Sequence, residues 1–200
     1  VSCVRDDAYA LELNEVFESV NPDQLHFAVS SAAFAGVRNA YEEPYRLGVD
    51  RWLALLAIKA RGEESAVIID VGTACTIDIM DDGQHLGGYI FPGMALARDA
   101  LVSNTDKIRF SKHPDPSISP GTDTAGCVLS GVWLTLLATC QHVIDRFPDS
   151  KVYLTGGSAK ELGALGVGGE RVDGLAAPVV LEERHCGAEH AGVARREALQ

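Results

Sequence analysis

The segment with the clearest chemical potential is DVGTACTID at residues 70–78. A carboxylate followed by glycine and threonine in a tight turn would bring backbone N–H groups and a hydroxyl close to a bound phosphate. Asp70 could hold a metal or a monovalent cation that neutralises the phosphate charge. The alternative is a plain β-turn in which Asp70 and Thr73 cap free N–H groups. The sequence contains no GxxxxGK[ST] motif, so a phosphate site here would not be a P-loop.

A second segment, LGVDRW at residues 47–52, places an aspartate beside an arginine at the start of a predicted helix. Asp50 could take a proton from a hydroxyl group, while Arg51 could bind a carboxylate. The preceding loop carries Tyr41 and Tyr45, which would lie over this pair. Asp50 could instead be only the N-cap of the helix. Arg51 in the first helical turn is unfavourable for the helix dipole, which favours a functional reason for its presence.

Two glycine pairs are associated with predicted strands, in GGYIFPG at residues 87–93 and in LTGG at residues 154–157. Such pairs allow a planar ring or a phosphate to approach the backbone closely. They could equally be tight connections between a strand and a helix. The six histidines are dispersed, and no local motif supports a metal-binding pair or a Ser-His-Asp or Cys-His catalytic arrangement.

These motifs require a framework of strands and helices to position them. Residues 66–71 form a continuous apolar run, which is typical of a strand buried on both faces. The segments 74–80 and 85–90 flank Asp81-Asp82-Gly83, which predicts a hairpin. The other expected elements are strands at 1–4, 25–31 and 151–155, a helix after Asp7, helices at 50–60, 94–102, 124–147, 158–165 and 185–200, and irregular segments at 35–48 and 104–122.

From residue 66 onward, the expected order is three meandering strands followed by alternating helices and strands. This is the order of a ribonuclease-H-like half-domain, the α/β unit that is duplicated in the actin and sugar-kinase ATPase superfamily. We therefore expect an α/β protein with an actin-like ATPase fold. Residues 1–61 would be the C-terminal remnant of a first half-domain with a substrate loop and a linking helix, and residues 62–200 would be a complete second half-domain. This architecture alone permits many functions.

The composition is that of a globular chain with an acidic balance. Of 200 residues, 46% are hydrophobic and 22% are charged, and 17 Lys+Arg against 28 Asp+Glu give a formal net charge of −11. Without clustered positive charge, the chain is not expected to bind nucleic acid. It has neither a signal peptide nor an uninterrupted apolar run of about 18 to 20 residues, so no membrane contact is expected. Five scattered cysteines are typical of reduced thiols, which predicts a cytoplasmic protein.

Taken together and in this order, the motifs resemble those of type III pantothenate kinases. The resemblance extends from residue 1 to about residue 157. It is specific because LGxDRW and DxGTAxTxD occur together at this spacing. The matching segments are GVRN at 36–39 with Tyr41, LGVDRW at 47–52, DVGTACTID at 70–78, GGYIFPG at 87–93, Thr124, and LTGG at 154–157.

The resemblance implies a homodimeric enzyme that uses ATP with Mg²⁺ to phosphorylate pantothenate to 4′-phosphopantothenate, the first step of coenzyme A biosynthesis. It implies that Asp50 is the catalytic base for the pantothenate hydroxyl and that Asp70 binds a monovalent cation, K⁺ or NH₄⁺. Thr124 would contact pantothenate across the dimer interface. The full implied sets are Tyr41, Gly48, Val49, Asp50, Arg51 and Thr124 for pantothenate, with Gly72, Thr73, Gly156 and Gly157 for ATP.

The sequence departs from the family pattern in one respect. Family members begin with a DxGN[ST] turn that cradles the ATP phosphates and supplies a metal-binding aspartate, and this turn does not occur in the sequence. We expect the chain to be a fragment of a longer kinase that is inactive alone. The alternative is a non-catalytic homologue that binds pantothenate or a nucleotide as a regulatory protein. A kinase for another sugar or acid would need a different substrate loop at residues 41–51.

Overall fold

The computed structural model describes residues 28–103 and 115–175, which divide into two compact units. The described part of the first unit is residues 28–64 with Gly83–Leu86 and Leu175. The second unit is Ser65–Asp82 with the described part of Gly87–Gly174. The division into half-domains at 1–61 and 62–200 stays a prediction. The strand expected at 1–4, the helix after Asp7 and the helix at 185–200 lie outside the described residues.

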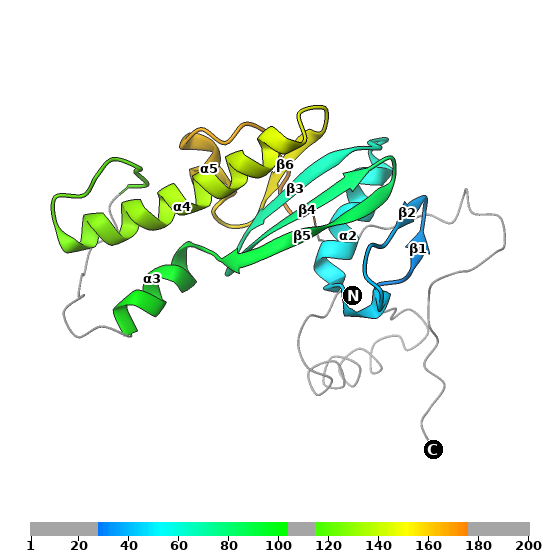
Figure 1. The fold of residues 1–200 in the computed structure, drawn as a ribbon, viewed down its shortest axis with the longest axis horizontal. Helices are drawn as coiled ribbons and strands as arrows, with labels where there is room; N and C mark the ends of the chain where they lie inside the picture. Colours follow the sequence, from blue (N-terminus) through cyan, green and yellow to red (C-terminus); the bar gives the residue numbers. More distant parts are fainter. Residues whose placement is uncertain (1–27, 104–114, 176–200) are drawn as a thin grey trace, which may run out of the picture. The chain divides into compact units, whose positions relative to one another are not determined.

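The first unit contains a short hairpin, drawn in blue in Figure 1. Strand β1 (Ala33–Phe34) pairs antiparallel with β2 (Val37–Arg38), and both residues of the intervening turn have positive φ. Strand β2 also pairs with the start of the strand β5, where Arg38 lies in parallel register with Gln84. The loop that follows β2 is therefore anchored at a sheet.

The segment before and after this hairpin differs from the prediction. The strand expected at 25–31 is not observed in its described part, where the Ser30 hydroxyl instead donates a 2.7 Å hydrogen bond to the carbonyl of Leu47. The segment expected to be irregular at 35–48 contains β2 and a 3₁₀ helix, η2 (Pro44–Arg46). Polar side chains here give the backbone local partners in place of a strand ladder, which the apolar pattern did not indicate.

Helix α2 (Val49–Ala60) confirms the helix predicted at 50–60 to within one residue. It is almost wholly buried from Arg51 to Ile58. Gly48 is the residue that precedes the helix, and its carbonyl accepts the Trp52 N–H at 3.0 Å. The hypothesis that Asp50 is the N-cap is therefore wrong, because Asp50 already lies within the first helical turn.

The second unit is built on a mixed sheet with the strand order β5-β4-β3-β6-β7. Strand β3 is antiparallel to β4 and parallel to β6, and β6 is parallel to β7. Three meandering strands with parallel strands added beside the first confirm the α/β class and the ribonuclease-H-like order. The strands are β3 (Ala66–Val71), β4 (Ala74–Asp81), β5 (Gln84–Pro92), of which the part from Gly87 belongs to this unit, β6 (Lys151–Thr155) and β7 (Glu170–Arg171).

Helix α4 (Thr124–Arg146) packs on the core of this unit (Figure 1). Its buried residues recur every three or four positions, which places them on one face. By length and composition this helix could cross a membrane, a test that the core helices of water-soluble proteins also pass. The core it joins includes Val67, Ile69, Val71, Cys75 and Ile77 from the sheet, with Leu136, Cys140 and Val143 from α4.

The remaining helices of the second unit also follow the sequence. Helix α3 (Met94–Ser103) matches the helix expected at 94–102, and α5 (Ala159–Ala164) lies within the one expected at 158–165. The described part of the irregular segment, residues 115–122, has no helix or strand. None of the residues in α3 is buried, although Met94 and Ala97 contact the core.

Candidate active site

The candidate site of the second unit is the turn between β3 and β4. Asp70, at the carboxyl end of β3, lies in register with Thr155 of the parallel strand β6 and is half-buried. Gly72 and Thr73 form the turn, and the Gly72 N–H donates to the carbonyl of Ala74 at 3.0 Å. Both turn residues are exposed. The turn therefore presents a hydroxyl and main chain to solvent beside a carboxylate.

Two glycines outside the turn allow the main chain to approach it closely. A Cβ atom built on Gly93 would lie 2.1 Å from the carbonyl oxygen of Gly72, and the Gly93 N–H donates to the carbonyl of Thr73 at 2.9 Å. A Cβ on Gly156, whose φ is +92°, would lie 2.3 Å from Asp70 Oδ1. Gly93 and Gly156 thus fix the turn and the carboxylate through the absence of a side chain.

Within the second unit, the structure brings Asp70, predicted to bind a cation, close to three of the four residues predicted for ATP, Gly72, Thr73 and Gly156. Gly157 is next in sequence, but a Cβ at this position would meet nothing within 4 Å. The two glycines of the LTGG segment therefore differ: one is packed against Asp70 and the other is open.

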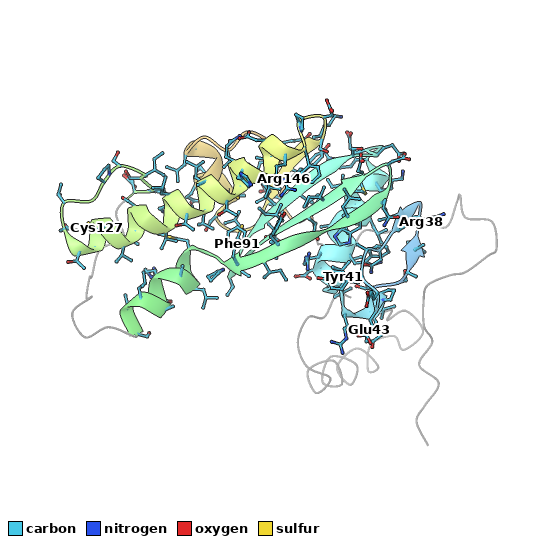
Figure 2. All side chains as sticks on the ribbon, in the orientation of Figure 1. Arg38, Tyr41, Glu43, Phe91, Cys127 and Arg146 are labelled. Atoms are coloured by element: carbon cyan, nitrogen blue, oxygen red, sulfur yellow. The ribbon has the colours of Figure 1, made fainter. Side chains whose placement is uncertain are left out.

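The candidate site of the first unit is centred on Tyr41 and Arg51. Arg51 Nη1 donates a 3.0 Å hydrogen bond to the Tyr41 hydroxyl oxygen, and the guanidinium carbon lies 5.9 Å from the centre of the tyrosine ring. Arg51 is buried, with 6% of its surface exposed. Figure 2 labels Tyr41 in the loop that precedes α2. The predicted proximity of Tyr41 and Arg51 is thus observed, whereas Tyr45 is 70% exposed.

Asp50 is positioned by the start of α2. Its Oδ1 accepts the Arg51 N–H at 2.9 Å, and a Cβ on Gly48 would lie 2.6 Å from the same oxygen. A larger residue at position 48 would displace the carboxylate, which explains glycine there. Among the described residues, Oδ2 of Asp50 has no hydrogen-bond donor. This oxygen is therefore available to accept a proton. Val49, between Gly48 and Asp50, is the first residue of the helix.

Sequence reasoning missed the roles of two residues, Asn39 and His85, that hold the loop carrying Tyr41. The Asn39 amide donates to the carbonyls of Ser31 at 3.2 Å and Pro44 at 3.1 Å, and its Oδ1 accepts the Tyr41 N–H at 3.0 Å. The fully buried His85 stacks on the Tyr41 ring. Asn39 stood within a matching segment, but His85, 44 positions after Tyr41, had no local signal.

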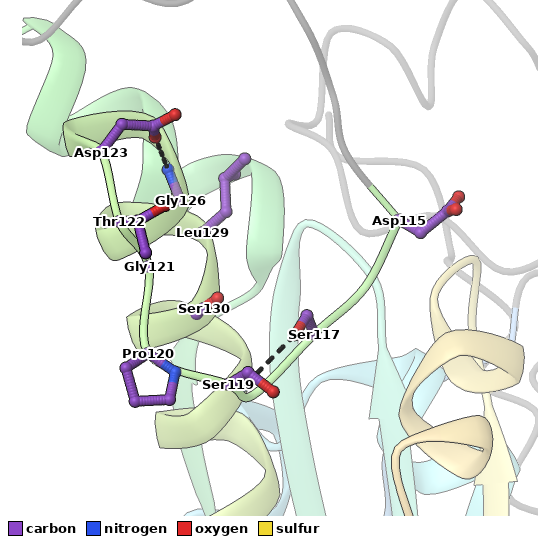
Figure 3. A pocket seen from close by; sticks show the side chains of 10 residues that line it. All are labelled: Asp115, Ser117, Ser119, Pro120, Gly121, Thr122, Asp123, Gly126, Leu129 and Ser130. Carbon is purple, nitrogen blue, oxygen red and sulfur yellow. Dashed lines mark hydrogen bonds between the residues drawn. The ribbon is translucent and has the colours of Figure 1, made fainter.

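Thr124 lies elsewhere, as the first residue of α4. Oδ1 of Asp123 caps this helix by accepting the Gly126 N–H at 2.7 Å (Figure 3). Asp123 and Gly126 line a hollow of about 230 Å³ together with the loop before the helix, and Thr124 is exposed next to them. Cys127, labelled in Figure 2, is also exposed at this end of α4. The structure therefore places Thr124 beside the hollow and apart from the turn at Gly72.

Cys75 and Cys140 are buried in the second unit, where their thiols lie within hydrogen-bonding distance. A hydrogen bond with the Cys140 thiol, burial and the nearby carboxylate of Asp70 hold the pKa of the Cys75 thiol well above its ordinary value. The thiolate is the nucleophilic form of cysteine, so Cys75 is not a nucleophile in the folded protein. Within residues 28–103 and 115–175, no group of three or more His, Cys, Asp or Glu side chains could hold a metal ion.

Comparisons with known proteins were made for the whole chain. A sequence model of the family described as type III pantothenate kinase matches residues 1–146. The type III pantothenate kinase of Acinetobacter baumannii (strain ACICU) is 43% identical over 134 residues, which are 67% of this chain and 54% of the relative. That of Marinobacter nauticus is 34% identical over 179 residues, 88% of this chain and 74% of the relative. The chain spans about half the length of the first of these relatives.

A comparison with solved structures supports the fold. A crystal structure from Campylobacter jejuni, described as a conserved Baf family transcriptional activator, aligns with a TM-score of 0.55 at 22% sequence identity. The alignment covers 82% of this chain and 72% of that one. At this identity, the likeness concerns the fold and not the activity.

Proposed function

Because the chain belongs to the type III pantothenate kinase family, we propose that it serves the ATP-dependent phosphorylation of pantothenate to 4′-phosphopantothenate, the first step of coenzyme A biosynthesis. The observation that carries the proposal is the exposed Gly72–Thr73 turn, with a carboxylate beside it and two glycines packed against it. A P-loop is absent from the sequence, and this turn is the part of the described chain best built for a phosphate.

In the proposed reaction, each residue has one task. Asp50 takes the proton from the pantothenate hydroxyl, for which its Oδ2 is available. Tyr41, Gly48, Val49 and Arg51 hold pantothenate, and the buried guanidinium of Arg51 supplies the positive charge for its carboxylate end. Gly72, Thr73, Gly156 and Gly157 receive the phosphates of ATP. Phosphoryl transfer depends chiefly on such positioning and on charge neutralisation.

Family membership implies that ATP is used with a divalent metal, Mg²⁺ in this proposal. Asp70 would hold the monovalent cation, K⁺ or NH₄⁺. The half-buried carboxylate of Asp70 supplies oxygen atoms, the ligands that hard cations prefer. When bound, these cations neutralise phosphate charge that this acidic chain cannot neutralise with a Walker lysine.

We also propose a cytoplasmic homodimer that associates through the second unit, binding neither nucleic acid nor membranes. Helix α3 has no buried residue, and large apolar side chains are exposed at Leu96 and Leu101 in α3, at Ile90 in β5 and at Leu134 in α4. Thr124 and the hollow at the start of α4 would lie near this interface and contact pantothenate of the partner. Association would cover the apolar side chains.

The dimer is tested by Leu101→Glu, with Lys160→Glu as a control at an exposed site in α5. A charge buried in the interface should convert the dimer to a monomer, as measured by analytical ultracentrifugation. The control should remain dimeric. A wild-type protein that sediments as a monomer at all concentrations would contradict this part of the proposal.

The catalytic proposal is tested by Asp50→Asn, with Glu42→Gln as a control at an exposed carboxylate in the same unit. Pantothenate-dependent ADP formation is measured with Mg²⁺ and K⁺ on this chain and on a form extended at its amino end to the length of its relatives. We expect the extended form alone to turn over, because a DxGN[ST] turn is absent from these 200 residues. Asp50→Asn should lower turnover by about 10²- to 10⁴-fold while pantothenate still binds.

The alternative is a regulatory protein that binds pantothenate or a nucleotide without catalysis. It is favoured by the absence of the DxGN[ST] turn from the sequence. Pantothenate binding without turnover in either form of the chain would support this alternative. Turnover that survives in Asp50→Asn would instead show that another group is the base.

A further inference from the structure

We propose that His85 and Asn39 are positioning residues that fix the loop at residues 39–46, here called the clamped loop, and so set the affinity for pantothenate. The inference rests on the proposed function, because it assigns Tyr41 of this loop to pantothenate. It goes beyond that function by adding two residues that no motif indicated as functional. All the contacts concerned lie within the first unit.

Asn39 makes three hydrogen bonds, two within the clamped loop and one to the segment before β1. Its amide nitrogen donates to the carbonyl of Ser31, before β1, at 3.2 Å and to that of Pro44, in the loop, at 3.1 Å. Its Oδ1 accepts the backbone N–H of Tyr41 at 3.0 Å. One side chain thus uses both donor hydrogens and an acceptor lone pair, so the amide is specified and the isosteric carboxylate would lose both donated bonds.

His85 fixes the loop from the sheet side. It lies on β5, is completely buried, and its Nδ1 lies 3.5 Å from the Ala40 backbone nitrogen, whose N–H it accepts. Its ring stacks on Tyr41 with 6.3 Å between centroids and 16° between planes. An acceptor at Nδ1 places the proton of the neutral imidazole on Nε2. A buried aromatic pair restrains the position and the tilt of the tyrosine ring.

The tilt of this ring decides where the Tyr41 hydroxyl points. Arg51 can only donate, and its Nη1 donates to the hydroxyl oxygen, so the proton of the hydroxyl is directed elsewhere. Among the described residues, the Tyr41 hydroxyl has no acceptor. The hydroxyl is therefore a donor available to an oxygen atom of a ligand, held in place by His85 on one side and Arg51 on the other.

The effect should be on pantothenate binding and not on nucleotide binding. The nucleotide residues lie in the second unit, and their turn is fixed by Gly93 and Gly156. A selective change in one dissociation constant would separate positioning from a general loss of structure.

The experiment uses three variants and a control. His85→Asn keeps an acceptor near Nδ1 and loses the stacked ring, His85→Phe keeps a ring and loses the acceptor, and Asn39→Asp removes the two donated bonds. Gln84→Ala is the control, because Gln84 is the neighbour of His85 and donates to carbonyls at Arg38 and His85 outside the clamped loop. Dissociation constants for pantothenate and for ADP are measured by calorimetry, and melting temperatures are recorded for all proteins.

We expect pantothenate affinity to fall about tenfold in each variant, because a buried polar group or a ring contact loses its partner. Affinity for ADP should stay within twofold, and Gln84→Ala should match the wild type. Hydrogen exchange at the Ala40 and Tyr41 amides should accelerate at the same time, with or without pantothenate.

The outcomes separate the two proposals. Folded variants that retain wild-type pantothenate affinity, or that lose ADP affinity equally, overturn the positioning role. Unchanged exchange at Ala40 and Tyr41 also overturns it. A wild-type protein that binds no pantothenate, while the variants still show accelerated exchange, means that the proposed function is wrong and that the clamped loop serves a different ligand.

Discussion

The turn at Gly72–Thr73 and the clamped loop are both irregular segments next to a sheet, yet different forces hold them. The turn is held by main-chain hydrogen bonds and by glycines whose lack of a side chain permits close approach. The clamped loop is held by side chains, those of Asn39 and His85. Adding a Cβ atom to one of the glycines should therefore disrupt the turn, whereas removing a side-chain polar atom should disrupt the clamped loop.

Gly156→Ala is the substitution with the largest expected effect on this comparison. The new Cβ would lie 2.3 Å from Asp70 Oδ1, and alanine would also be strained at a φ of +92°. Two such penalties of about 1–3 kcal/mol each would weaken ATP binding on the order of a hundredfold. Gly157→Ala is the matched control, because a Cβ there meets nothing within 4 Å. Equal nucleotide affinity in both variants, measured by calorimetry, would contradict the role of the packed glycine.

Tyr41→Phe tests the clamped loop by the opposite route, since it removes a single oxygen atom. The Arg51 guanidinium would lose its 3.0 Å partner while remaining buried. Pantothenate should bind about tenfold more weakly, because the lost hydrogen bond involves a charged group, whereas ADP should bind as before. Tyr45→Phe, at a hydroxyl on a residue that is 70% exposed, should leave both affinities unchanged. A drop in ADP affinity in Tyr41→Phe would contradict the assignment of pantothenate to the clamped loop and of the nucleotide to the turn.

Asp123→Ala tests whether a side-chain hydrogen bond also stabilises the second unit. The carboxylate accepts the Gly126 N–H at 2.7 Å and caps α4. Its loss should lower the free energy of unfolding by about 1 kcal/mol, measured by urea denaturation. Asp115→Ala removes another carboxylate that lines the same hollow but is not the cap of α4. It should lower the free energy of unfolding by less. Equal destabilisation by both substitutions would show that the effect comes from charge and not from the cap.

Gly131→Ala has the smallest expected effect and the opposite sign. Gly131 lies on an exposed face of α4, and a Cβ there would meet nothing within 4 Å. Alanine in a helix interior should raise the free energy of unfolding by about 0.5–1 kcal/mol. A destabilised variant in the same urea experiment would indicate a contact that the isolated chain lacks, such as a subunit interface.

The same contrast explains what could be predicted from the sequence. The helix at 49–60, the buried strand at 66–71 and the hairpin around Asp82 carry strong periodic or turn signals, and each is observed within one or two residues. The turn at Gly72 could be located because its acid, glycine and threonine are contiguous. In its described part, residues 28–31, the strand expected at 25–31 is not observed, and the Ser30 hydroxyl donates to the Leu47 carbonyl instead.

The role of His85 could not be predicted, because a stacked pair separated by 44 positions in sequence leaves no local pattern. The N-cap hypothesis for Asp50 failed for a similar reason. Gly48 occupies the N-cap position before the helix, so the carboxylate of Asp50 does not serve as the cap. In both cases the path of the backbone determines the contacts of the side chain, and composition and spacing do not specify that path.

The contrast between buried and exposed thiols has a practical consequence for spectroscopy. Cys75 and Cys140 are sealed in the core, and the raised pKa of Cys75 keeps it protonated under labelling conditions. Cys127 is exposed near the hollow at the start of α4, where its thiol donates to the carbonyl of Gly121 at 3.3 Å. With Cys3 and Cys186 replaced by serine, a maleimide dye on Cys127 would give the folded protein a single fluorescent reporter. Its emission would then follow subunit association in real time, without any enzymatic assay.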